Sequence, residues 1–134
     1  MREILFRGKR TDNGEWMYGS PIPEDYYALI RFWNTEEFEY EEHLVAPESI
    51  SEFTGLTDKN GNKIFEGDIV RGLFLHSCPV NAVVAFDNGS FGLLWDRAGA
   101  ETFWAFTSIC NVEYEVIGNI HDNPELLKGD ESNV

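Results

Sequence analysis

The chain has 134 residues, a formal net charge of −14 at pH 7 and a hydrophobic fraction of 43%. That apolar content argues against a disordered protein, and no apolar run approaches the ~18 residues of a membrane-spanning helix. Because nucleic-acid affinity comes mostly from Lys and Arg, the acidic balance disfavours direct binding of DNA or RNA.

The first predicted hairpin surrounds Asn13-Gly14, between LFRGKRT and EWMYG. Asn-Gly tolerates the positive φ angles of a tight hairpin turn, and aromatic residues in the flanking runs favour strands. Phe6 and Trp16 are candidates for the buried face of this hairpin. The start of the chain has only a short apolar patch and no small-residue cleavage site, so no secretion signal is evident. We therefore expect a cytoplasmic protein.

Two further strands are predicted at Tyr26–Trp33 and Phe38–Val45. Near the start of the second strand, glutamates alternate with aromatic residues, which places the aromatics on one face and the carboxylates on the other. The carboxylates of this candidate partner surface are Glu37, Glu39 and Glu41. Two interpretations remain open: a charged face that prevents edge-to-edge aggregation, or a surface that binds a partner.

The central segment FTGLTDKNGNKIFEGDIV first suggests a calcium loop. Asp58, Asn60 and Asn62 match the first, third and fifth ligand positions of an EF-hand. The sixth position holds lysine in place of glycine, however, and the twelfth holds isoleucine in place of glutamate. The segment is better explained as a second hairpin with a two-residue type I′ turn at Asn60-Gly61.

The third predicted hairpin surrounds Asn88-Gly89, between NAVVAF and SFGLLW. Strands are also predicted at Asp68–Leu75 and Glu113–Ile120. Helical signals are limited to single turns, one at Pro47–Phe53 and one that begins at Pro124. Short apolar runs separated by closely spaced turns predict a mainly β protein of the sandwich or barrel type.

Three segments together resemble the YopX family, small proteins encoded mainly by bacteriophages and by prophages in bacterial genomes. In the family's order, these segments are FRGKRTDNGEWMYG, FTGLTDKNGNKIFEGDIV and YEVIGNIHDNPELL. The resemblance implies a β-rich fold that contains a small barrel of the SH3-like roll type. It implies no known activity, substrate, cofactor or catalytic residue.

The expected organisation is an N-terminal β lobe packed on a small SH3-like barrel or roll. We expect the lobe to cover residues 1–56 and the barrel residues 57–124, with a short polar tail at 125–134. Near the start of the barrel, Gly67 permits a sharp turn. The side chain of Asp68 can cap that turn before the next strand begins.

Residues suited to zinc binding or nucleophilic catalysis are scattered along the chain. They are His76, Cys78, Cys110 and His121. The chain has no Cys-x-x-Cys pair, which makes it a poor match for a zinc site, and no oxyanion loop is visible beside a Cys–His pair. Without a secretion signal, both cysteines are expected to be reduced thiols. The sequence assigns no catalytic, cofactor-binding or metal-binding residue.

Two apolar runs, Tyr26–Trp33 and Phe103–Phe106, lack the alternation of a half-exposed sheet, which predicts either self-association or burial inside the chain. The acidic charge, the lack of an assembled catalytic signature and the family resemblance predict a non-enzymatic phage or prophage accessory protein. It is expected to act by contact with a host or phage protein. The alternative is an acidic mimic of nucleic acid that inhibits a host DNA- or RNA-binding protein.

Overall fold

The computed structural model describes residues 3–72, 79–97, 100–106 and 114–127. The chain divides into two compact units, Met1–Phe53 and Thr54–Val134. The division falls three residues before the end of the expected N-terminal lobe. It lies within the strand Ser51–Thr57, whose first three residues belong to the first unit and whose last four belong to the second.

The described residues lie mainly in β-strands, which confirms the predicted class. The strands in chain order are β1 (Phe6–Lys9), β2 (Trp16–Pro23), β3 (Ala28–Asn34), β4 (Glu39–Val45), β5 (Ser51–Thr57), β6 (Lys63–Phe65), β7 (Asp68–Gly72), β8 (Val80–Asp87), β9 (Ser90–Arg97), β10 (Ala100–Ala105) and β11 (Tyr114–Asn119). Two short 3₁₀ helices, η1 (Pro47–Ser49) and η3 (Pro124–Leu127), begin at prolines, as the sequence predicts. None of the described helices is long and apolar enough to cross a membrane.

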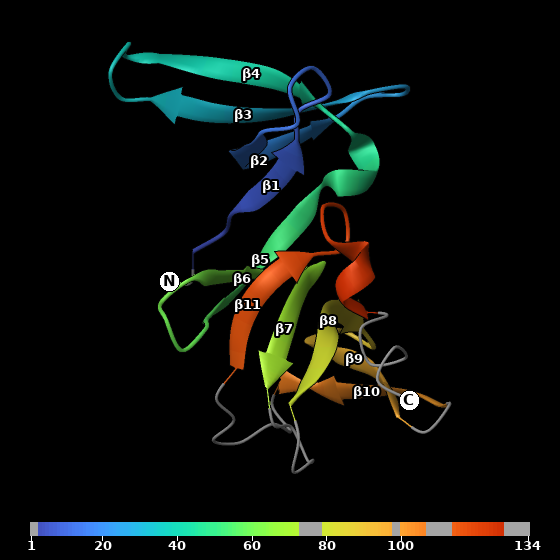
Figure 1. The fold of residues 1–134 in the computed structure, drawn as a ribbon. Coiled ribbons are helices and arrows are strands. Elements are labelled where there is room, and N and C mark those ends of the chain that lie inside the picture. The colour runs from blue at the N-terminus through green and yellow to red at the C-terminus, as the bar shows by residue number, and fades with distance from the viewer. Residues whose placement is uncertain (1–2, 73–78, 98–99, 107–113, 128–134) are drawn as a thin grey trace. The chain divides into compact units, whose positions relative to one another are not determined.

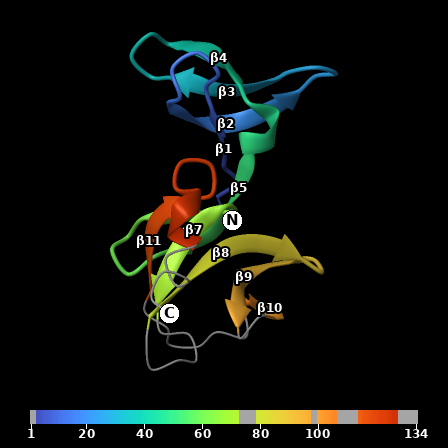
Figure 2. The ribbon, with the colours of Figure 1, turned by 45° about the vertical axis from the view of Figure 1, so that its right-hand side comes forward.

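The strands form two antiparallel sheets, which Figure 1 traces from blue to red along the chain. The first has the strand order β4-β3-β2-β1-β5-β6 and the second the order β10-β9-β8-β7-β11. Figure 2 shows the meander of β8, β9 and β10 in the second unit. The expected barrel or roll is therefore found only in part, because among the described residues the five-stranded sheet is open and has β10 and β11 at its edges.

The core of the first unit is formed by Ala28, Ile30 and Val45, against which Phe6 packs. The two aromatic residues predicted to share the buried face of the first hairpin do not share it. Phe6 lies opposite Gly19 and Trp16 lies opposite Lys9 across the same pair of strands, an odd offset that places the two rings on opposite faces. Trp16 is instead covered by the guanidinium of Arg7, 4.6 Å from the ring centroid.

The core of the second unit gathers apolar side chains from β6 to β9. Its buried members are Ile64, Val70, Ala82, Val84, Leu93 and Trp95. Trp104 and Phe106, from one of the two apolar runs, pack against this core. The rings of Trp95 and Trp104 meet edge to face, with centroids 5.4 Å apart. Trp104 and Phe106 therefore contribute to packing within the second unit.

The three Asn-Gly dipeptides all lie in hairpins, but their turns differ. At Asn88-Gly89 both residues have positive φ, 49° and 78°, as a type I′ turn requires. At Asn60-Gly61 only the glycine does, with a φ of 85°. There the N–H of Asp58 donates to the carbonyl of Asn62, which leaves three residues in the loop. The prediction of a two-residue type I′ turn at Asn60-Gly61 is therefore wrong, although the hairpin itself is present.

The turn before β7 follows the prediction. Gly67 has a φ of 88°, and the N–H of Phe65 donates a 2.8 Å hydrogen bond to the carboxylate of Asp68, which is 2% exposed. The side chain of Asp68 thus closes the turn from which the strand begins. The predicted continuation of this strand beyond Gly72 lies outside the described residues.

Candidate functional site

The hairpin of β3 and β4 carries exposed aromatic side chains, among them Trp33 and Tyr40, beside the exposed charges of Arg31 and Glu42. Residues directly opposite each other in an antiparallel pair project from the same face. The pairs on one face are Leu29 with Leu44, Arg31 with Glu42, and Trp33 with Tyr40. We call these six residues the hairpin outer face.

The centre of the hairpin outer face is aromatic and cationic. Trp33 is 48% exposed and Tyr40 is 58% exposed, and their rings meet edge to face with centroids 4.9 Å apart. The guanidinium of Arg31 lies 4.1 Å from the centroid of the Tyr40 ring and 3.7 Å from a carboxylate oxygen of Glu42. These contacts order the side chains among themselves while leaving large apolar surfaces accessible to solvent.

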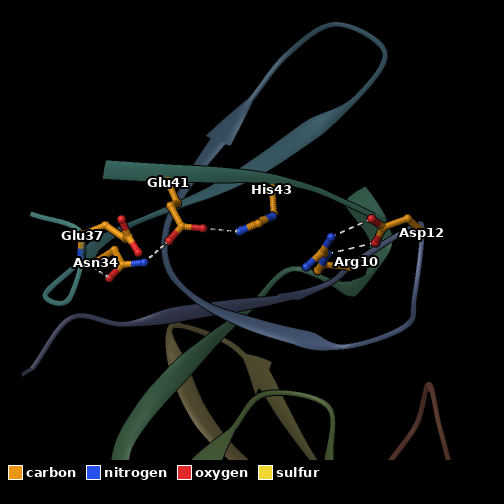
Figure 3. A network of polar contacts seen from close by, with 6 residues as sticks. All are labelled: Arg10, Asp12, Asn34, Glu37, Glu41 and His43. Atoms are coloured by element: carbon orange, nitrogen blue, oxygen red, sulfur yellow. Dashed lines mark hydrogen bonds and ion pairs between the residues drawn. The ribbon is translucent and has the colours of Figure 1, made fainter. Parts of the chain in front are cut away.

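The opposite face of the same hairpin carries a polar cluster of Asn34, Glu41 and His43 (Figure 3). The side-chain amide of Asn34 donates to Glu41, and Nε2 of His43 lies 3.2 Å from the other carboxylate oxygen of Glu41. The imidazole also stacks on Phe32, with ring centroids 5.6 Å apart. The hydrogen bond from Asn34 is the largest cause of a lowered pKa at Glu41, with burial acting against it.

Arg10 and Asp12 form a second polar contact on the first unit (Figure 3). Two guanidinium nitrogens of Arg10 donate to the two carboxylate oxygens of Asp12, at 2.9 and 2.6 Å. This paired hydrogen bond lowers the pKa of Asp12 and raises the pKa of Arg10. Arg10 is thus held by a carboxylate of its own loop.

The three glutamates of the predicted partner surface occupy different environments. Residues 35–38 form the turn between β3 and β4, so Glu37 lies before the strand. Its N–H donates to the side-chain carbonyl of Asn34, and Phe38 next to it has a positive φ of 53°. Glu39 and Glu41 do share a face of β4, where Glu41 takes part in the polar cluster. The strand alternation expected at Phe38 therefore starts one residue later.

The hairpin outer face is not predicted from the sequence, because the carboxylates stand out in the local pattern and their cross-strand partners do not. The signal was present in the alternation of Tyr40, Glu42 and Leu44 along one strand. The partners Trp33 and Arg31 follow from that alternation only when the register of the turn is known. That register depends on the positive φ at Phe38, and no local sequence motif predicts this backbone conformation.

Asp58, the first ligand position of the rejected calcium loop, is bound by the protein itself. Its carboxylate accepts hydrogen bonds from the backbone N–H groups of Asn60, Asn62 and Val116, at 2.9, 2.8 and 2.9 Å, and another from the side chain of Asn62. Burial raises the pKa of Asp58, but these hydrogen bonds outweigh burial and lower it overall. The carboxylate thus serves as the organising acceptor of the loop.

The residues considered for zinc binding or nucleophilic catalysis fall mostly outside the described ranges. His76, Cys78 and Cys110 lie there, and His121 follows β11 in a turn where its N–H donates to the side chain of Asn119. Within the described ranges, no group of three or more His, Cys, Asp or Glu side chains is placed to hold a metal ion.

Comparisons with known proteins connect this fold to one family. The model of the YopX protein family matches residues 5–128. A crystal structure of protein EF1440 from Enterococcus faecalis is similar, with a TM-score of 0.55 and 27% sequence identity. The alignment covers 95% of this chain and 99% of that chain. No curated protein matches.

Proposed function

The chain belongs to the YopX family, and from this premise we propose a non-enzymatic accessory protein of bacteriophages and prophages. It acts in the cytoplasm of the bacterial host by binding another protein, encoded by the host or by the phage. The hairpin outer face is the binding surface. The observation that carries the proposal is the exposure of Trp33 and Tyr40 beside Arg31.

The composition of the hairpin outer face supports this role. Trp, Tyr and Arg are the three residue types most enriched where binding energy concentrates in protein interfaces. The hairpin outer face holds one of each, and Tyr40 contacts both Trp33 and Arg31. Leu29 and Leu44 extend the apolar area along the same two strands. Because the rings are already held by one another, docking a partner costs little side-chain entropy.

The charges around this surface indicate the character of the partner. Glu42 lies within the hairpin outer face. Glu36 and Glu37 are exposed in the turn between β3 and β4, and Glu39 is exposed at the start of β4. The whole chain has a net charge of −14. A partner with an apolar recess bordered by Lys or Arg side chains complements this arrangement.

The test is affinity capture from a bacterial lysate with matched variants. The wild-type chain and the double variant Trp33→Ala/Tyr40→Ala are compared with Phe86→Ala/Phe91→Ala. Phe86 and Phe91 are a suitable control because they also form an edge-to-face cross-strand pair, with centroids 5.0 Å apart, in the second unit. We expect one protein to be retained by the wild type and the control and lost with the first variant.

Two outcomes contradict the proposal. One is the failure of the wild type to retain any protein above background at low and moderate salt. The other is equal retention by the wild type and by Trp33→Ala/Tyr40→Ala, with both proteins shown to be folded by circular dichroism.

A second candidate function, acidic mimicry of nucleic acid, is favoured by three exposed glutamates, Glu36 and Glu37 in the turn between β3 and β4 and Glu39 at the start of β4. The variant Glu36→Gln/Glu37→Gln/Glu39→Gln removes their charge and leaves the Asn34–Glu41 contact in place. Mimicry predicts that this variant loses inhibition of a host nucleic-acid-binding protein, and that inhibition by the wild type weakens steeply with salt. Inhibition that is unchanged in this variant and does not depend on salt would contradict acidic mimicry.

A further inference from the structure

Within the described part of the chain, one edge of β4 is unpaired along most of its length, and the hydrogen bonds at the C-terminal end of the strand show which backbone groups point to that edge. In the order of the first sheet, β4 is the terminal strand and pairs with β3 on one side only. At its far end, Thr11 donates an N–H to the carbonyl of Leu44, and Ala46 donates to the carbonyl of Lys9. A single bridge joins Arg10 and Val45 there. The carbonyl of Leu44 therefore points away from β3.

Tyr40 and Glu42 continue that edge. In a strand, the backbone N–H and C=O groups of every second residue point to the same side. The groups of Tyr40 and Glu42 thus point in the direction of the Leu44 carbonyl, away from β3. Among the described residues, no strand pairs with this part of β4, and Figure 1 shows β4 with β3 on one side. Two donors and two acceptors are available to extend the ladder that Thr11 begins.

The side chains that border this edge are carboxylates on both faces of the strand. Glu39 and Glu41 project from one face and Glu42 from the other. The cations close to them are already engaged: Arg31 contacts Glu42 and Tyr40, and Arg10 is bound to Asp12. His43 lies beside Glu41 on the same face. A second copy of the acidic edge would bring like charges together, which disfavours self-pairing.

We infer that the free edge of β4 binds an extended, basic segment of the partner protein by strand addition. The backbone groups of Tyr40 and Glu42 supply hydrogen bonds to the segment, and the carboxylates select Lys or Arg at alternate positions. The hairpin outer face then holds the apolar part of the same partner. This inference rests on the proposed function and names the chemistry of its partner.

A synthetic peptide tests the inference directly. The probe is a labelled seven-residue peptide of alternating Lys and Val, with both ends blocked, titrated with the full chain by fluorescence anisotropy at low salt. One control replaces Lys by Glu. A second control keeps the charges but carries N-methyl groups on two adjacent central residues, so that neither edge of the peptide can donate there. We expect the basic probe to bind about tenfold or more tightly than either control.

A matched pair of protein variants tests the edge from the other side. Glu42→Gln removes the charge, and Glu42→Pro also removes the outward N–H, which an edge strand tolerates. Probe binding should fall for Glu42→Gln and fall roughly threefold to tenfold further for Glu42→Pro. In the wild type, amide exchange at Tyr40 and Glu42 should slow when the probe is bound. If Glu42→Pro is unfolded, the N-methylated peptide and the amide exchange decide the question.

Equal binding of the N-methylated probe would overturn the inference, because it shows attraction between charges without strand pairing. Equal binding of the Glu probe, or unchanged exchange at both amides, would overturn it as well. The proposed function fails by a separate route, since it depends on capture of a protein through Trp33 and Tyr40. If capture is lost in Trp33→Ala/Tyr40→Ala and unchanged in Glu42→Pro, the proposed function is supported and strand addition at β4 is contradicted.

Discussion

The carboxylate of Asp58 accepts a 2.9 Å hydrogen bond from the backbone N–H of Val116, a residue 58 positions further along the chain. The same carboxylate holds the loop between β5 and β6, so one side chain joins that hairpin to β11. Asp58→Asn replaces one of the two accepting carboxylate oxygens by an NH2 group, which cannot accept the hydrogen bonds made there. We expect a loss of about 1–3 kcal/mol in the free energy of unfolding. Urea denaturation measures it, and Asp25→Asn, at an exposed bend, should change little.

The stability that Asp58 contributes should depend on pH. The pKa of Asp58 in the folded chain lies below its ordinary value of 3.8. A carboxyl group whose pKa is lowered by folding stabilises the fold above the unfolded pKa, and this contribution is lost as pH falls through the folded pKa. The difference in unfolding free energy between the wild type and Asp58→Asn should therefore be constant near neutral pH. It should shrink as pH falls below about 4.

The pKa values of Asp12 and Glu41 are lowered in the wild type and in Asp58→Asn alike, so their effects cancel in the difference in unfolding free energy between these two proteins. Denaturation curves from pH 7 to pH 2 provide the measurement. A difference that stays constant down to pH 2 would contradict the role assigned to the ionised carboxylate.

Gly118 is expected to tolerate no side chain. A Cβ at this position would lie 2.5 Å from Oδ1 and 2.8 Å from Cγ of Asn123, which also accepts a hydrogen bond from the N–H of Asn119. Gly118→Ala should cost about 1–3 kcal/mol of stability through this overlap. In a double-mutant cycle, Gly118→Ala should cost less in an Asn123→Gly background. Additive costs would show that the overlap is relieved in another way.

The two apolar runs should respond differently to a charge. Trp104 packs against the core of the second unit, so Trp104→Glu should lower stability by about 3 kcal/mol or more. Trp33 is 48% exposed, so Trp33→Glu should cost less than about 1 kcal/mol. Thermal melts followed by circular dichroism compare the two. Equal destabilisation would contradict the different environments of these side chains.

Self-association through the Tyr26–Trp33 run remains a proposal that light scattering decides. It predicts a wild-type mass above 15.3 kDa, and a return towards this value in Trp33→Glu. A wild-type mass of 15.3 kDa throughout the micromolar range would contradict self-association. The hairpin outer face would then be open to a different protein.

The sequence was sufficient to predict the β class and the places of the hairpins because these depend on local chemistry. Asn88-Gly89 specifies its turn through two residues that tolerate positive φ. Asn60-Gly61 has the same two residues and a different turn, since Asp58 gathers the N–H groups of the loop and is itself fixed by Val116. A contact over that distance is invisible in a local pattern.

The candidate site was predictable only in its location. The acidic segment drew attention to the hairpin of β3 and β4, but the partner surface was assigned to a row of glutamates. Glu41 is engaged with Asn34, whereas the exposed rings belong to Trp33 and Tyr40. Their pairing depends on a register set at Phe38, whose positive φ is unfavourable for an aromatic residue and follows from the turn as a whole.

Strand β5 has a practical consequence for dividing this polypeptide. Its residues Ser51 and Glu52 pair with β1 in the first unit, while Thr54 donates its hydroxyl to the carbonyl of Ile64 in the second. A cut between Phe53 and Thr54 would therefore leave each piece with half a strand. Overlapping fragments, 1–57 and 51–134, would give each piece its own complete copy of β5. If the units fold separately, they should do so from such overlapping pieces and not from abutting ones.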